Sequence, residues 1–140
     1  MLQRFHGYTS PSMETRESAI DGLGLFATKD LPESEVVAAW GGKIMRGFEL
    51  EKLPPSIGRN YAIELYPDFY IAETSVDELD ASDFINHSCE PNCEIVNVLI
   101  MRTKRPIQAG EELTADFSNP HGVEVPCRCG ASNCKKRVRF

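Results

Sequence analysis

The stretch that decides the fold is Asp83-Phe84-Ile85-Asn86-His87-Ser88-Cys89-Glu90-Pro91-Asn92-Cys93. It brings an Asn-His pair, a small hydroxyl, two thiols and a Pro-Asn turn together, between apolar runs that are typical of strands. Burying so many polar side chains costs free energy unless each of them finds a partner. We therefore expect this segment, the polar knot, to fold against another part of the chain.

A second group of thiols lies near the C-terminus, in Cys127-Arg128-Cys129-Gly130-Ala131-Ser132-Asn133-Cys134. Structural zinc sites are closed tetrahedra, often of four thiolates. Three thiols in such a loop predict a zinc site whose fourth ligand comes from elsewhere, with Cys89 and Cys93 as candidates. The basic residues Arg128 and Lys135-Lys136-Arg137 would offset part of the negative charge. The alternative is three unrelated free cysteines.

Length and composition limit the class of protein. A chain of 140 residues fits one domain with a real core. No run approaches the ~18 apolar residues of a membrane span. The start lacks a secretory pattern, so the clustered cysteines predict metal binding in a reducing compartment rather than disulfides. The net charge of −6 argues against general nucleic-acid affinity and suits a cationic partner such as a lysine-rich peptide, unless it serves solubility alone.

The order of apolar runs and breakers predicts a β-rich domain with little helix. A loose lead-in reaches Ser12, and a short helix over 48–53 ends at Pro54-Pro55. Residues 60–66 and 69–72 predict a hairpin. The run 94–102 predicts one strand buried on both faces, because apolar residues occupy both of its sides. The remaining expected elements are strands at 14–20, 25–27, 35–40 and 112–117, and a helical turn at 76–81.

Two further motifs flank the polar knot in the sequence. Asp21-Gly22-Leu23-Gly24-Leu25-Phe26-Ala27 places two glycines before a strand, which allows close backbone approach to a ligand, although Gly-x-Gly is most often only a turn. It lacks the third glycine and the helix of a dinucleotide fingerprint. Ala109 to Phe117 reads as a turn into a strand. A carboxylate at the strand end could be a general base, but a solvated or strand-capping role is more usual.

Taken in order, the glycine turn, the Asn-His-Ser-Cys knot, the Gly-Glu-Glu-Leu-Thr strand and the cysteine tail resemble the SET-domain protein-lysine methyltransferases with a post-SET zinc motif. The resemblance covers roughly residues 14–134. It implies a β-rich SET-domain (β-clip) fold of small curved sheets, in which the knot threads under a C-terminal loop as a pseudoknot. The expected organisation is an N-terminal lead-in at 1–13, the SET domain at 14–120 and a post-SET zinc-binding segment at 121–140.

The resemblance also implies a site. S-adenosylmethionine would bind on one face, and the target lysine would enter by a channel from the other. The family's pattern assigns cofactor contacts to Asp21, Leu23, Gly24, Leu25, Tyr61, Asn86, His87 and Arg128. Tyr61 would lie between the cofactor and the lysine channel, and the catalytic positions are Tyr61 and Phe117. Zinc would be held by Cys89, Cys127, Cys129 and Cys134, with Cys93 as the spare.

Three residues depart from the family's pattern. Phe117 stands where most active members have a catalytic tyrosine, and it has no hydroxyl. Ala115 replaces a Phe or Tyr and predicts a wider channel that favours higher methylation. Asp83 stands where Arg is frequent, so a local cofactor contact is lost.

The implied function is methyl transfer to a lysine side-chain amine of a protein, with histones or histone-like proteins as the expected substrate class. The alternative is a degenerate module that binds S-adenosylmethionine or a basic peptide with little or no turnover. No direct nucleic-acid or membrane partner is expected. The expected location is intracellular, in the nucleus of a eukaryote or the cytoplasm of a prokaryote.

Overall fold

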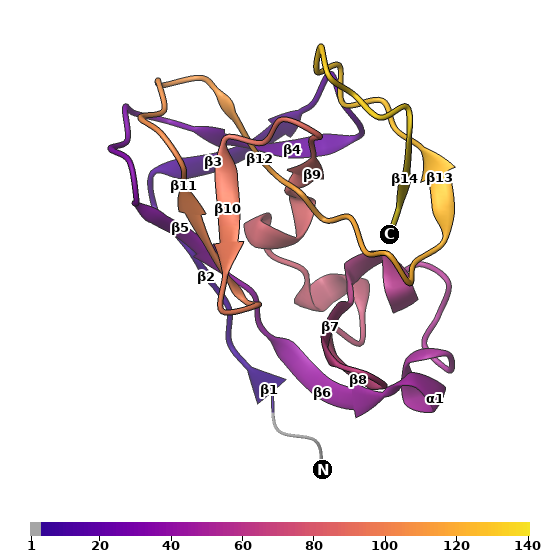
Figure 1. Ribbon diagram of the computed structural model, residues 1–140. Helices are drawn as coiled ribbons and strands as arrows, with labels where there is room; N and C mark the ends of the chain where they lie inside the picture. The colour runs from indigo at the N-terminus through magenta and orange to yellow at the C-terminus, as the bar shows by residue number, and fades with distance from the viewer. Residues whose placement is uncertain (1–3) are drawn as a thin grey trace.

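The computed structural model describes residues 4–140, and these residues form short strands and single helical turns (Figure 1). The N-terminal strands are β1 (Arg4–Phe5), β2 (Tyr8–Thr9), β3 (Met13–Glu17), β4 (Leu23–Ala27), β5 (Val36–Ala39) and β6 (Gly42–Arg46). The strands that follow are β7 (Ile63–Tyr66), β8 (Phe69–Ala72), β9 (Asn86–His87), β10 (Cys93–Val96), β11 (Ile100–Thr103), β12 (Glu112–Ala115), β13 (Glu124–Pro126) and β14 (Arg137–Arg139). The helices are α1 (Gly47–Leu50) and the 3-10 turns η1 (Gly58–Tyr61), η2 (Val76–Glu78) and η3 (Ala81–Phe84).

The strands of residues 4–140 form three four-stranded sheets and one two-stranded ribbon. The sheet orders are β1-β6-β8-β7, β10-β11-β5-β2 and β3-β4-β12-β9, and the ribbon is β13-β14. In Figure 1 the three sheets occupy the bottom, the left and the top of the molecule, and the C-terminal ribbon lies on the right. This arrangement confirms the predicted β-rich fold of small sheets.

The core lies mainly between the β10-β11-β5-β2 and β3-β4-β12-β9 sheets. Leu25, Val37, Met101 and Leu113 come from four different strands of these sheets, and all are fully buried. A smaller cluster of Met45, Leu50 and Ala72 packs beneath α1. Since burial of apolar surface is the main favourable term in folding, the first cluster is the principal support of the strands that reach the polar knot.

The predicted single strand at 94–102 is wrong, because this segment is the hairpin β10–β11. Cys93 pairs with Thr103 and Val96 with Ile100, around a loop at Asn97–Leu99. The backbone turns with positive φ at Asn97 (49°) and Val98 (68°). The run has apolar residues on both faces because it contains two paired strands, and not because a single strand is buried on both of its faces. Val98 hid the turn, because a β-branched residue rarely adopts positive φ.

The predicted loose lead-in is also wrong where the structure describes it, and residues 1–3 lie outside the described range. Tyr8 and Thr9 pair with β5, and Arg4 and Phe5 pair with β6. The strand β6, which none of the predicted elements covers, starts at Gly42 with φ of 132°. The predicted hairpin over 60–66 and 69–72 is confirmed as β7–β8, preceded by η1.

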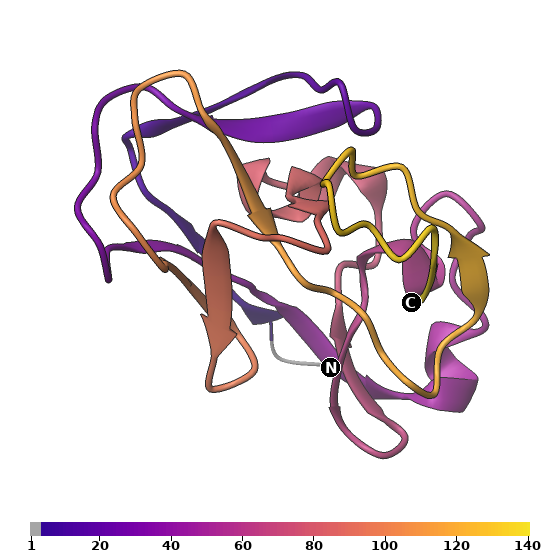
Figure 2. The same ribbon diagram turned by 45° about the horizontal axis from the view of Figure 1, so that its top comes forward.

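The polar knot lies against β12, so the expectation that it folds against a distant segment is confirmed. β9 pairs with β12 in parallel, with Asn86 opposite Thr114 and His87 opposite Ala115. Asn92 holds the other end of the knot: its Nδ2 donates to the Glu112 carbonyl at 2.8 Å, and its Oδ1 accepts from the Thr114 N–H at 2.9 Å. Figure 2 shows the C-terminal segment lying beside this region.

Candidate functional site

A pocket of about 310 Å³ opens where the glycine turn, the polar knot and the C-terminal segment meet. Three parts of the chain form its walls, and each contains residues of a motif identified in the sequence. The lining residues are Ile20, Asp21, Asn86, His87, Pro126, Cys127, Arg128, Cys129 and Phe140.

Asn86 ties the glycine turn to the polar knot. Its Nδ2 lies 3.1 Å from the Asp21 carbonyl oxygen, 3.0 Å from that of Leu23 and 2.8 Å from Glu112 Oε1. Both amide hydrogens of Asn86 therefore have acceptors on the chain, and its side-chain orientation is fixed before any ligand enters. This connection places Asp21 on the rim of the pocket.

His87 has a defined tautomer. Its Nδ1 accepts the backbone N–H of Phe117 at 3.1 Å, so the ring proton belongs on Nε2, which lies 3.5 Å from Cys89 Sγ. Burial lowers the pKa of His87, although Asp116 with Oδ1 at 3.5 Å opposes that shift. The ring packs edge-on against Phe140 at 5.1 Å. A neutral imidazole is therefore the stable form of this pocket wall.

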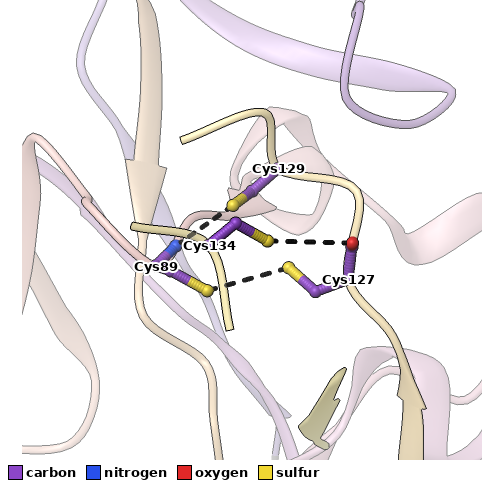
Figure 3. A group of neighbouring side chains, drawn as sticks. All are labelled: Cys89, Cys127, Cys129 and Cys134. Atoms are coloured by element: carbon purple, nitrogen blue, oxygen red, sulfur yellow. Dashed lines mark hydrogen bonds between the residues drawn. The ribbon is translucent and has the colours of Figure 1, made fainter. Parts of the chain in front are cut away.

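Four cysteines gather beside the pocket (Figure 3). The Sγ atoms of Cys89, Cys127, Cys129 and Cys134 all lie within 4.8 Å of one another. Cys89 and Cys127 are 3.8 Å apart at sulfur. Four ligands at about 2.3 Å from a tetrahedral zinc would lie about 3.8 Å from each other, so the donor set and its spacing fit Zn²⁺.

The cluster also separates the two candidates for the fourth ligand. Cys89 follows β9 and belongs to the cluster, whereas Cys93 begins β10 and is completely buried in the core. Burial raises the pKa of the Cys93 thiol to about 12, which leaves it a neutral packing group.

Backbone amides supply positive partners to the cluster. The N–H of Cys89 donates to Cys129 Sγ at 3.5 Å, the N–H of Lys135 to Cys89 Sγ at 3.5 Å, and the N–H of Lys136 to Cys134 Sγ at 3.4 Å. Burial opposes ionisation of Cys129, yet the N–H groups of Cys89 and Ala131 bring its pKa down to about 6. Burial has the opposite result at Cys89 and Cys127, raising the pKa of Cys89 and raising that of Cys127 to about 12. Of these three thiols, Cys129 therefore most readily forms the thiolate, the form in which cysteine binds metal.

The other predicted site residues lie away from the pocket lining. Leu23, Gly24 and Leu25 are in β4, where Leu25 is fully buried. Tyr61 ends η1 and packs edge-on against Phe84 at 6.4 Å.

The three residues that depart from the family's pattern, Phe117, Ala115 and Asp83, also lie outside the pocket lining. Phe117 packs edge-on against Trp40 at 5.7 Å, and Ala115 is fully buried in the core. The Asp83 carboxylate accepts the Asp80 N–H at 2.8 Å and so caps η3. Asp83 therefore stabilises the helical turn η3, at a position where many family members have an arginine.

Sequence reasoning missed three lining residues, Ile20, Pro126 and Phe140, and one residue behind the pocket, Glu112. Position beside a motif was the only signal for Ile20 and Pro126. No local pattern marks Phe140, which reaches the pocket because β14 pairs with β13.

The comparisons with known proteins agree with this geometry. The family model of the SET domain matches residues 22–118. Histone-lysine N-methyltransferase trithorax of Drosophila virilis is 35% identical over 130 residues, which cover 85% of this chain and 3% of that protein. Histone-lysine N-methyltransferase, H3 lysine-4 specific, of Schizosaccharomyces pombe is 34% identical over 133 residues, which cover 84% of this chain and 14% of that protein.

Among solved structures, the crystal structure of KRYPTONITE in complex with mCHG DNA and SAH matches with a TM-score of 0.69 at 26% identity. The match covers 89% of this chain and 28% of that one.

The chain belongs to the SET-domain family, and the predicted family is thereby confirmed. It spans only a small part of the length of the relatives that it matches. Within residues 4–140, no helix has the length and apolar character to cross a membrane.

Proposed function

We propose that this chain is an S-adenosylmethionine-dependent protein-lysine methyltransferase domain stabilised by zinc. The observation that carries the proposal is the pocket itself, because three motif-bearing segments meet there directly beside a group of four thiols. A volume of about 310 Å³ lies at the lower end of the range for small-molecule sites.

The residues present fit the cofactor. Asp21 offers a carboxylate suited to an amino or hydroxyl group, and Arg128 offers a cation suited to a carboxylate. His87 and Phe140 provide ring surface for a base. When bound, S-adenosylmethionine supplies an electrophilic methyl on a sulfonium. The chain's own task is to fix the orientation of the ligand and to exclude water.

Zinc would be held by Cys89, Cys127, Cys129 and Cys134. A closed four-thiolate site of this kind is structural rather than catalytic. It would join the knot to the C-terminal segment, and thereby hold Arg128 and Phe140 over the pocket.

The substrate amine must be uncharged to attack a methyl group. A free lysine has a pKa of about 10.4, and burial favours its neutral form. Tyr61, beside Phe84 at the end of η1, is the residue that we assign to the lysine channel. Its hydroxyl would orient the amine, and such positioning supplies much of the rate acceleration in a two-reactant step.

Charge supports a lysine-rich protein substrate, such as a histone. The first 118 residues hold twenty acidic and ten basic side chains, whereas residues 119–140 hold one acidic and five basic ones. The first 118 residues include β12, the strand that pairs with the polar knot, so a cationic peptide would be attracted to this part of the chain rather than to residues 119–140. Histone substrates imply a nuclear location.

The test is transfer of a labelled methyl group to histones, to a lysate and to the protein itself. The expected result is incorporation that falls in a Tyr61→Phe control. Incorporation no higher than that control would refute the proposal. Val98→Ala, a change at an exposed hairpin position, serves as the control that leaves transfer intact.

A second candidate is a module that binds the cofactor or a basic peptide without turnover. Phe117 favours it, because its ring packs against Trp40 and it offers no hydroxyl where a catalytic tyrosine is expected. Loss of one preorganised polar contact costs about 3 kcal/mol, or about a hundredfold in rate.

Phe117→Tyr distinguishes the two candidates. A rise of up to about a hundredfold in methyl transfer, with unchanged cofactor affinity by calorimetry, would show that the missing hydroxyl limits the rate. Cofactor binding with silent transfer in both forms would favour the binding module.

A further inference from the structure

We propose that Glu112 is the positioning residue of the pocket, and that Gly24 is a glycine to make room for the Glu112 carboxylate rather than to approach the cofactor. The inference rests on the proposed function for the identity of the ligand. Its structural basis lies in four residues that come from separate strands and turns: Ser18, Gly24, Asn86 and Glu112.

The Glu112 carboxylate joins both sides of the glycine turn to the polar knot. Ser18 Oγ lies 2.8 Å from each carboxylate oxygen and donates to them, while Asn86 Nδ2 donates to Oε1 at 2.8 Å. Ser18 in turn accepts the N–H of Ile20 at 2.9 Å. One side chain of β12 therefore reaches the turn after β3 and the strand β9.

These contacts control the pocket wall directly. Ile20 and Asn86 both line the pocket, and each is one or two hydrogen bonds away from Glu112. Asn86 Nδ2 also lies near the carbonyl oxygens of Asp21 and Leu23, at 3.1 and 3.0 Å. Of these three acceptors Glu112 is the only carboxylate, and it accepts the shortest of the three hydrogen bonds, so it should hold the amide most strongly.

The space at Gly24 is filled by the same carboxylate. A Cβ placed on Gly24 would overlap Glu112 Oε1, and would lie 2.8 Å from Glu112 Cδ and 3.1 Å from Ser18 Cβ. Gly24 lies within β4, opposite Arg16 of β3. Lack of a side chain, rather than backbone freedom, is therefore what this position requires.

Glu112 is placed to act through other residues. It does not line the pocket, and its carboxylate is occupied by Ser18 and Asn86. Glu112 is therefore not suited to act as a general base, the role considered from the sequence for a carboxylate of this strand. Its effect should appear in the affinity of the pocket for its ligand.

The experiment measures S-adenosylhomocysteine binding by calorimetry and the thermal unfolding midpoint for a double-mutant cycle. The variants are Glu112→Ala, Gly24→Ala and the pair together. Glu112→Ala should weaken binding by about tenfold or more, since a hydrogen bond to a charged group is lost. Glu112→Gln keeps one acceptor oxygen and should recover part of that loss.

Glu111→Ala is the matched control. Glu111 is the neighbouring carboxylate, but it pairs with Arg105 at 2.8 Å on the surface and has no contact with the pocket lining. Its removal should leave the affinity for S-adenosylhomocysteine within about twofold of wild type, as expected of a surface substitution.

The cycle decides between the two roles of Gly24. If Gly24 serves Glu112, Gly24→Ala should weaken binding in the wild-type background and have little further effect in Glu112→Ala. Equal losses in both backgrounds would overturn the proposal, because Gly24 would then contact the ligand itself. A lower unfolding midpoint in Glu112→Ala with unchanged affinity would also overturn it, since the role would be merely structural.

Failure of the proposed function gives a different result. If wild type binds no S-adenosylhomocysteine, the cofactor assignment and the positioning role both fall. Non-additive effects of Gly24→Ala and Glu112→Ala on the unfolding midpoint would still show that these two positions are in contact. The cofactor assignment would then be wrong, while the contact between Gly24 and Glu112 would stand.

Discussion

The two walls of the pocket are held by different physical means. Asn86 and His87 lie in β9, which pairs with β12 and rests on fully buried core residues such as Leu113. The opposite wall, with Arg128 and Phe140, belongs to a segment in which Val138 is the only buried residue among 119–140. Hydrophobic burial holds the first wall, whereas the second depends on the β13–β14 ribbon and the four thiols. The two walls should therefore be separable by experiment.

Removal of metal should have the largest effect. Structural zinc can contribute about 10 kcal/mol or more to the folding of a small domain, so a chelator or Cys129→Ser should release the C-terminal wall. We expect S-adenosylhomocysteine affinity to fall by about a hundredfold or more, with hydrogen-exchange protection lost in 121–140 and retained in β4 and β12. Zinc content and hydrogen exchange are the measurements.

Cys93→Ala is the control for that experiment, because Cys93 lies in the core and outside the cluster. It should leave the zinc content at one per chain. If chelation caused equal loss of hydrogen-exchange protection in both walls, the two walls would not be held by different means.

A core substitution tests the other wall. Leu113→Ala removes a fully buried side chain of β12 and should lower the free energy of unfolding by about 2–5 kcal/mol. Urea unfolding followed by fluorescence measures it. Val98→Ala, at a side chain that is 46% exposed, should change stability by about 0.5 kcal/mol or less. Similar losses for the two variants would show that the β9 wall does not depend on this core.

A smaller effect should depend on pH and arise at Asp83 in η3, the turn that precedes β9. Burial raises the pKa of Asp83 to about 6, although the Asp80 N–H that it accepts opposes the shift. Asp80 itself and Arg4 are the charged groups that act on it, and Asp83 in turn acts on Glu73. A raised folded pKa means that the protonated carboxyl stabilises the fold below about pH 4, and that this contribution is lost as pH rises through about 6.

Asp83→Asn should therefore unfold at a higher temperature than wild type at pH 7.5, by a few degrees, with the difference shrinking towards pH 5. Thermal unfolding followed by circular dichroism at several pH values measures it. A difference that is constant from pH 5 to 7.5 would exclude titration of Asp83 as its cause.

The sequence predicted much of the site because its chemistry is local. The Asn86-His87 pair, the cysteine spacing and the glycine turn each lie within a few residues, and Asp21, Asn86, His87 and Arg128 do line one pocket. The errors had two causes: the lead-in pairs with the distant strands β5 and β6, and the turn of a local hairpin carries no clear turn residue. The run 94–102 looked like one strand because apolar residues mark burial but not the point at which a chain reverses.

Residue types and their spacing predicted a β-rich domain and a thiol zinc site, and the resemblance of its motifs implied the SET fold. Two matters were decided only by the tertiary structure. The first is the physical reason why Cys93 stays out of the cluster, as the resemblance implied: β10 begins at Cys93 and places its side chain on the buried face. The second is that Gly24 faces Glu112, a residue far along the chain, because β4 and β12 pair. The sequence shows which residues are neighbours within a turn. Only the folded structure shows that the Glu112 carboxylate fills the space beside Gly24.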